Sequence, residues 1–198
     1  MIPFSQIITF LKYAFSFGYA YYLEKREKFL IQSLEDEQAI FAILELAGEN
    51  LGADRVELIY MHNGGGRLVP GVEKYVKVAN EVVITNKIIP RHSSHSRKVD
   101  NCFLVKVGKM MFADYSTILV NVDDLPKGFL KNLYTDEGVK QAVACYVASN
   151  EKYMWYISFQ FAEDKRVDIT GEDQEMIDNY RARIVDILRK YFSINHTC

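Results

Sequence analysis

The stretch KQAVACYVASNEKYMWYISFQF, residues 140–161, decides the fold class of this 198-residue chain. It contains two apolar and aromatic runs, 140–148 and 153–161, which are typical of β-strands. The polar residues 149–152 between them, with Asn150, are typical of a hairpin turn. We therefore predict two paired antiparallel strands. Aromatic residues occupy both alternating sets of positions in the second run, which indicates a central strand covered on both faces.

A helix is predicted after the hairpin, over 170–192. Thr170-Gly171-Glu172-Asp173 fits a capping box, in which the first and fourth residues bond each other's backbone. Apolar residues then recur at helical spacing, at Ile177, Tyr180, Ile184, Ile187, Leu188 and Tyr191. This apolar face must be buried against a helix at 30–51, within the chain or across a dimer.

The residues before the hairpin predict a helix and two further strands. Helical spacing continues over 24–51, where Ser33-Leu34-Glu35-Asp36 is either a capping box or a polar stretch of one long helix. Gly52 is placed to end that helix. Strands are predicted at 55–61 and 75–84, followed by a polar middle segment and short apolar stretches at 102–107 and 112–120. This order predicts an α+β fold, an antiparallel sheet with its helices on one face.

The first residues of the chain predict a separate apolar helix. Between Met1 and Leu23 the only charge is Lys12. The run is barely as long as the roughly 20 apolar residues that span a bilayer, and a lysine near its middle is costly there. Lys25, Arg26 and Lys28 follow it, as cations do at a membrane interface. Two interpretations stay open: a membrane anchor or interfacial helix, and a helix that packs on a partner or a second copy.

Composition excludes several classes of protein. The net charge is −2 from 24 basic and 26 acidic residues, so no basic surface for nucleic acid is expected. The three cysteines, Cys102, Cys145 and Cys198, form no CxxC pair, which argues against a disulfide framework and a zinc knuckle. No signal peptide is expected, because no basic region precedes the apolar run. We expect a cytoplasmic protein, free or attached to the cytoplasmic face of the inner membrane.

This order of elements resembles the GAF domain. The resemblance rests on 44–61 (helix into first strand), on 138–163 (paired strands) and on 170–191 (closing helix). The stretch Ile59-Tyr60-Met61-His62-Asn63-Gly64-Gly65 also looks like the strand ending in His-Asn-Gly of GAF-like proteins from bacteria and their phages. We accordingly predict an apolar N-terminal helix at 1–29 and a GAF-like domain at 30–198, with N- and C-terminal helices packed on one face.

The resemblance implies a homodimer and, on the far sheet face, a pocket for a small molecule in many members. Other members lack the pocket and serve as dimerisation or protein-contact modules. The Asn-Lys-Phe-Asp-Glu signature of cyclic-nucleotide-binding members is absent. The cysteine set of free methionine-sulfoxide reductases is also missing. No output domain follows residue 198, so a protein partner is expected to supply the output.

A candidate site lies between the sheet and the segment 88–120. Its hypothetical ligand-binding residues are Tyr60, His62, Arg91, His92, His95 and Arg97. The arginines favour a small anionic ligand, because a partly desolvated guanidinium binds carboxylate and phosphate bidentately, and they disfavour a metal at the two histidines. The alternative is a plain surface loop. The turn at 62–66 is interpreted as a tight turn that His62 caps, rather than a phosphate-binding loop.

No catalytic constellation is found in the sequence. Asp123-Asp124 and Asp136-Glu137 are paired carboxylates next to Pro126 or Gly138, and both are interpreted as turn residues. We therefore expect no enzyme, no cofactor and no metal. The function predicted is a GAF-like sensory or adaptor domain that binds a small ligand or a protein partner and dimerises. The alternative is a structural or membrane-associated assembly subunit that uses the GAF fold as a scaffold. A phage gene is one expected source of such a subunit.

Overall fold

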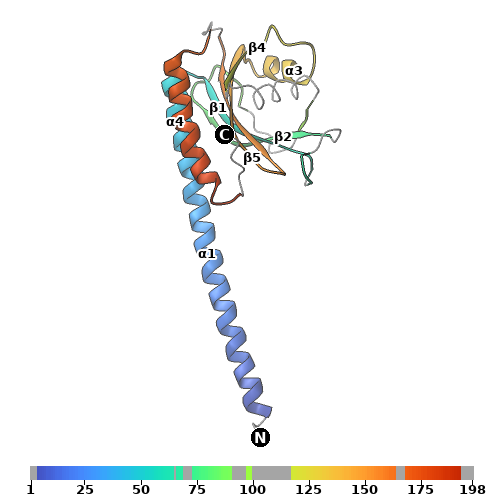
Figure 1. Ribbon diagram of the computed structural model, residues 1–198, viewed down its shortest axis with the longest axis vertical. Helices are drawn as coiled ribbons and strands as arrows, with labels where there is room; N and C mark the ends of the chain where they lie inside the picture. Colours follow the sequence, from blue (N-terminus) through green and yellow to red (C-terminus); the bar gives the residue numbers. More distant parts are fainter. Residues whose placement is uncertain are drawn as a thin grey trace. The chain divides into compact units, whose positions relative to one another are not determined.

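The computed structural model describes residues 4–64, 66–68, 73–90, 97–99, 117–163 and 168–192, with backbone alone at 4–18 and 20. Figure 1 shows the elements along the chain. In chain order they are α1 (Phe4–Leu51), β1 (Arg55–His62), β2 (Tyr75–Val83), β3 (Arg97–Lys98), β4 (Thr117–Asn121), α3 (Phe129–Asp136), β5 (Gln141–Ser149), β6 (Met154–Phe161) and α4 (Gly171–Leu188). The short apolar stretch at 102–107 lies outside the described residues.

The strands form one six-stranded sheet in the order β3-β2-β1-β6-β5-β4. Every neighbouring pair is antiparallel. The predicted α+β class and antiparallel sheet are therefore confirmed. β1 and β6 occupy the centre, and every residue of β6 is buried, as its aromatic residues on both faces predict.

The hairpin between β5 and β6 is closed by a side chain. Asn150 Oδ1 accepts hydrogen bonds from the backbone N–H groups of Lys152 and Tyr153, at 2.9 and 2.8 Å. The Asn150 N–H in turn donates to the Tyr153 carbonyl at 2.9 Å. An asparagine favours such a turn because its side chain replaces a backbone acceptor. The hairpin predicted from 140–161 is confirmed.

The chain divides into two compact units, residues 1–39 and 40–198. The helix α1 runs through both without a break, so 33–36 is part of one long helix and not a capping box. No helix among the described residues is long and apolar enough to cross a bilayer.

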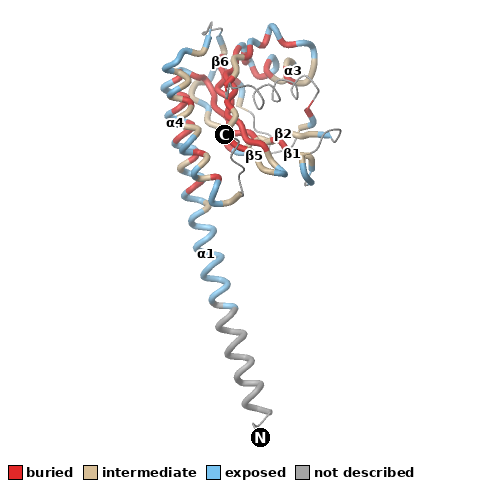
Figure 2. The backbone as a smooth tube through the Cα atoms, viewed as in Figure 1, coloured by how far each residue is buried: buried red, intermediate tan, exposed pale blue. Residues whose placement is uncertain are grey.

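One face of the sheet packs against helices of the second unit. Ile43, Leu44 and Ala47 of α1 and the buried residues of α4 share a core with β1, β5 and β6. Figure 2 shows buried positions in α4 and in the strands of the sheet beside it. Ile177, Ile184 and Leu188 are the buried residues of α4, all members of its predicted apolar face. The capping box at Thr170 is also present, with Asp173 as its partner.

The junction between α1 and β1 explains two small residues. Gly52 has a φ of 66°, a left-handed conformation that suits glycine, and it ends α1 as predicted. At Gly48, a Cβ would lie 2.6 Å from Cγ2 of Val56. Helix and sheet therefore approach each other closely only because position 48 has no side chain. The carboxylate of Asp54 accepts hydrogen bonds from Thr85 Oγ1 and from the Ala162 N–H. It therefore connects the start of β1 to the residues that follow β2 and β6.

The opposite face of the sheet has a second core under α3. Figure 1 shows α3 on the side of the sheet away from α4. Leu130 and Tyr134 of α3 pack with Ile59 and Met61 of β1 and with Ala142 of β5. This is the face on which the charged side chains of the central strands gather.

Candidate functional site

A buried arginine stands at the centre of the second face. Arg55 is the first residue of β1, a strand bonded to β2 on one side and β6 on the other. Its side chain is fully buried. A charge in this position must be paired and hydrogen-bonded, because desolvating it alone is very costly.

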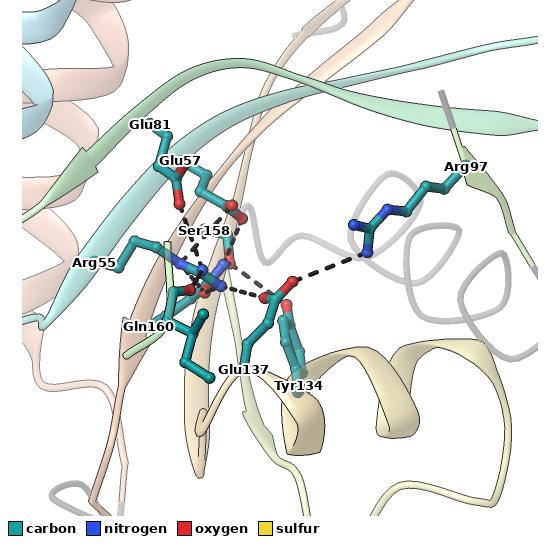
Figure 3. A network of polar contacts seen from close by, with 9 residues as sticks. Arg55, Glu57, Glu81, Arg97, Tyr134, Glu137, Ser158 and Gln160 are labelled. Carbon is teal, nitrogen blue, oxygen red and sulfur yellow. Dashed lines mark hydrogen bonds and ion pairs between the residues drawn. The ribbon is translucent and has the colours of Figure 1, made fainter. Parts of the chain in front are cut away.

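The guanidinium of Arg55 is fully used by groups of the protein itself (Figure 3). Nε donates to Gln160 Oε1 at 2.8 Å, and Nη2 donates to the same oxygen. Nη2 also donates to Glu137 Oε2 at 2.5 Å. Nη1 donates to the Ile89 carbonyl at 2.6 Å and to Glu81 Oε1 at 3.4 Å. An arginine has five N–H donors, so Arg55 serves as an anchor rather than a receptor for a ligand.

Gln160 connects this arginine to the other buried polar groups of the central strands. Its Nε2 donates to Glu57 Oε2 at 2.6 Å and to Ser158 Oγ at 3.1 Å. Ser158 Oγ lies 3.5 Å from the Tyr134 hydroxyl of α3. The alternation of side chains along β1 and β6 places Glu57, Ser158 and Gln160 on the same face as Arg55, since residues two apart point the same way.

Glu137 is where the buried network reaches the outer edge of the sheet. It is the C-cap residue of α3, and its carbonyl accepts a hydrogen bond from the Ile89 N–H at 3.0 Å. Its Oε2 binds Arg55, whereas its Oε1 lies 3.9 Å from Nη1 of Arg97 on β3. Figure 3 shows the Glu137 carboxylate between the two guanidinium groups.

Arg97 is the cation of this group that keeps contact with solvent. Its side chain is 35% exposed, against 0% for Arg55. The 3.9 Å separation from Glu137 is an ion pair without a close hydrogen bond. The group therefore combines a fixed cation, a shared carboxylate and a second cation that is partly exposed. Among the described residues, no three His, Cys, Asp or Glu side chains are placed to hold a metal ion.

The described site residues predicted from the sequence lie on two different faces. Arg97 pairs with Val76 of β2 and shares the face of the buried network. Tyr60 points to the helix-covered face, where it lies opposite Trp155, and His62, two residues further along β1, is on the same side and contacts the Tyr60 ring. The structure thus brings Tyr60 and His62 together and separates both from Arg97 by the thickness of the sheet. Arg91, His92 and His95 lie outside the described residues.

His62 caps the turn after β1. Its Nδ1 accepts a hydrogen bond from the Gly64 N–H at 3.0 Å, and Gly64 has a φ of 86°. The imidazole stacks on Tyr75 with ring centroids 5.8 Å apart. Partial burial, with Lys77 nearby, lowers the pKa of His62 below its ordinary value. A neutral imidazole is the form that accepts this hydrogen bond, as the capped tight turn predicted from the sequence requires.

Tyr60 belongs to a cluster of aromatic rings on the same face. Its ring lies 5.6 Å from His62 and 5.7 Å from Tyr153, measured between centroids. Tyr153 and Trp155 both contact Phe192, the latter at 4.8 Å. These contacts bury apolar area at the end of the sheet and give Tyr60 a packing role.

Cys145 is the small buried residue that its apolar surroundings predict. It is fully buried on β5, and its Sγ donates to the Tyr146 carbonyl at 3.3 Å. Burial raises the pKa of the Cys145 thiol to about 12. The thiolate is the reactive form of cysteine, so this residue is chemically inert at neutral pH.

Sequence reasoning missed Arg55 and Glu137. Arg55 and Glu57 occupy alternate positions of the strand predicted at 55–61, and both are fully buried. Glu137 was interpreted as a turn residue, and it does follow α3, but its side chain is an internal ligand of Arg55. One signal was present: two opposite charges at alternate positions of a strand in the middle of the sheet.

The fold is GAF-like, as comparisons with solved structures show. No family model matches the chain, and no curated protein matches it in sequence. A phycocyanobilin-bound GAF domain from a cyanobacterial phytochrome matches 85% of this chain and 94% of its own, with 19% identity and a TM-score of 0.54. A far-red cyanobacteriochrome photoreceptor matches 88% of this chain and 97% of its own, with 9% identity and a TM-score of 0.60.

A third match is a domain of a protein described as a two-component sensor histidine kinase from Sinorhizobium meliloti 1021. It has 12% identity and a TM-score of 0.53, over 78% of this chain and 91% of its own. At these identities the likeness concerns the fold. The GAF-like architecture predicted from the order of elements is confirmed.

Proposed function

We propose that this chain is a GAF-like sensory or adaptor domain without a catalytic site, which binds a small anionic ligand at Arg97. The observation that carries the proposal is the arrangement of Arg97 beside Glu137. Arg97 is 35% exposed and lies 3.9 Å from a carboxylate that Arg55 already holds. A carboxylate or phosphate can accept from the remaining donors of Arg97 bidentately, without breaking a short hydrogen bond.

The same arrangement supplies a route by which binding would change the domain. Glu137 caps α3 and also bonds the Ile89 N–H through its carbonyl. An anion that draws Arg97 away from Glu137 would change the charge around the Glu137 carboxylate. Because Glu137 contacts Arg55, the end of α3 and Ile89, this change would act on all three at once. Arg91, His92 and His95 would add to the lining in this proposal. Tyr60 and His62, on the other face, form no part of it.

Thermal-shift measurements with inorganic phosphate and small carboxylates test the proposal. We expect at least one anion to stabilise the native chain and to lose that effect in Arg97→Ala. Lys98→Ala is the matched control, because Lys98 is the neighbouring cation, on the other face, ion-paired with Glu73. It removes the same charge and should keep the shift. Equal shifts in both variants, or no shift in the native chain, would remove the ligand-binding proposal.

We also propose that the domain dimerises, with a protein partner receiving its output. Support comes from α1, where large apolar side chains including Leu23, Leu30 and Leu34 are exposed. Exposed apolar residues in this number on one helix are typical of an interaction surface. Light scattering of the full chain at several concentrations should show a dimer or larger species. A monomer throughout would contradict this part of the proposal.

The alternative is a structural or membrane-associated assembly subunit, of the bacterial and phage type that the His-Asn-Gly resemblance suggests. One observation favours it: Tyr19, Tyr21 and Tyr22 are exposed close to Lys25 and Arg26, the residue types of a membrane interface. Co-sedimentation with anionic lipid vesicles distinguishes the two. Sedimentation of the full chain, and none of a chain that begins at residue 29, would favour the alternative.

A further inference from the structure

Some of the exposed apolar residues of α1 follow an eleven-residue repeat, whereas Tyr21, Tyr22, Phe29, Ile31 and Leu46 are exposed and lie outside it. Tyr19, Leu23 and Arg26 are followed eleven residues later by Leu30, Leu34 and Glu37. Such a repeat corresponds to about 3.67 residues per turn, so its positions remain on one face of a helix. Tyr19, Leu23, Leu30 and Leu34 are 42–60% exposed, and Arg26 and Glu37 are exposed as well. We call these six residues the α1 stripe.

Four other side chains of this part of α1 contact each other within the helix. Lys28 Nζ lies 2.7 Å from Glu24 Oε1, an ion pair one turn apart. Lys25 Nζ lies 5.0 Å from the centre of the Tyr21 ring. At about 100° per residue these four residues project away from the α1 stripe. The α1 stripe is an apolar surface with one cation, Arg26, and one anion, Glu37, which occupy the same position in successive repeats.

The order of charges along the stripe selects the orientation of a partner helix. In a parallel pair of identical helices, Arg26 faces Arg26 and Glu37 faces Glu37, which is repulsive at both places. In an antiparallel pair, Leu30 meets Leu34 of the second copy and Arg26 meets Glu37. The same alignment sets Leu23 opposite Phe41, an exposed residue of α1 that continues the repeat.

We infer that the α1 stripe binds the α1 stripe of a second copy in antiparallel orientation, with Arg26 of each chain paired to Glu37 of the other. This inference rests on the proposed dimer and adds its interface and orientation. A second copy fits better than a lipid surface, because a bilayer would have to receive the Glu37 carboxylate within its apolar face. The second copy instead offers a cation to each anion and an apolar residue to each leucine.

A charge-exchange series tests the pairing. Arg26→Glu should weaken dimerisation about tenfold, since attractive pairs at both ends become repulsive. Glu37→Arg should weaken it to a similar extent. The double variant Arg26→Glu/Glu37→Arg restores opposite charges and should return the dissociation constant to within about threefold of the native value. Neither residue has a charged neighbour three or four positions away on α1, so the exchange leaves the charge pairs within the helix unchanged.

The series also separates the orientation from the dimer itself. In a parallel dimer, Arg26→Glu replaces one like-charge pair with another, and the dissociation constant should hardly change. A native dimer with that behaviour would overturn the antiparallel arrangement and leave the proposed dimer standing. A native chain that is monomeric by sedimentation equilibrium would overturn both, and binding of that monomer to anionic vesicles would assign the stripe to lipid.

Oxidative cross-linking of Leu23→Cys gives an independent measurement. In the antiparallel pair, position 23 of one chain lies opposite position 41 of the other, so the two introduced cysteines are roughly 27 Å apart along the axis. We expect no more cross-linked dimer than in the native chain, which carries the three natural cysteines. Phe41→Cys mixed with Leu23→Cys should cross-link. Rapid cross-linking of Leu23→Cys alone would overturn the inference.

Discussion

The face of the sheet under α1 and α4 and the face under α3 are built from the same two central strands. Toward the helices, β1 and β6 present Val56, Leu58, Ile157 and Phe159, all apolar. Toward α3 the same strands present Arg55, Glu57, Ser158 and Gln160, all polar and buried. Burying a charge network generally adds little net stability compared with apolar residues of similar volume. Both faces have a hydrophobic core, but only the face under α3 combines its core with buried charges, and this is the face where a ligand is proposed to act.

The largest effect is expected from placing a charge on the apolar face. Ile184 of α4 is fully buried in that core. Ile184→Asp should lower the free energy of unfolding by about 4 kcal/mol or more, because it removes apolar contacts and buries a carboxylate. Ala182→Asp, at an exposed position of the same helix, should cost less than about 1 kcal/mol. Urea unfolding of both variants measures the difference, and equal losses would contradict the burial of this face.

Removing the central charge should affect the polar face nearly as strongly. Arg55→Met leaves Glu57, Glu81 and Glu137 without their common partner and should cost about 3 kcal/mol in urea unfolding. The matched control is Arg67→Met, which breaks an exposed ion pair of 3.0 Å with Glu151. That change should cost less than about 1 kcal/mol. If the two variants were equally stable, the network would have no structural role.

A smaller effect is expected where helix and sheet approach most closely. Gly48→Ala puts a methyl group 2.6 Å from Val56 Cγ2, so either the Val56 side chain or α1 must shift. Overpacking costs about 1–3 kcal/mol, and the better helix propensity of alanine returns at most about 1. Gly171→Ala is the control, since a Cβ there meets no atom within 4 Å. We expect a net loss in thermal unfolding at position 48 alone, and a gain there would refute the close approach.

The smallest effect concerns His62 and pH. Its pKa is lowered in the folded chain, so the unfolded chain binds the proton more readily. The contribution of His62 to stability is then present above the unfolded pKa of about 6.5 and is lost as pH falls through that value toward the folded one. His62→Ala should show a weaker decline in stability than the native chain between about pH 7 and 5. Parallel curves for the two proteins would exclude the neutral cap.

Local features of the fold could be predicted from the sequence. The hairpin depends on Asn150 and its neighbours. The capping box of α4 depends on Thr170 and Asp173, which lie within the same four-residue stretch. Such signals act over a few residues and do not require knowledge of the rest of the chain. The same holds for Gly52 at the end of α1, whose left-handed conformation only glycine adopts readily.

The candidate site could be predicted only in part. Because side chains alternate along a strand, Tyr60 and His62 can be predicted to share a face, but the sequence does not indicate which face α3 covers. Arg55 and Glu137 are 82 residues apart, and their contact depends on the order of strands in the sheet. The end of α4 also differs from the predicted one: the helix ends at Leu188, whereas the apolar spacing in the sequence continues to Tyr191.

The hydrogen-bonded side-chain partners of Arg55 lie far from it in the sequence, and this separation affects when the network can form during folding. The partners Glu81, Glu137 and Gln160 are 26, 82 and 105 residues away from Arg55. The β5–β6 hairpin closes over a short turn, whereas the Arg55 network requires β1, β2, α3 and β6 to have met. Distant contacts form late, after loop closure has been achieved. We expect the transition state for folding to lack these ion pairs, so that Arg55→Met accelerates unfolding and leaves the rate of folding almost unchanged.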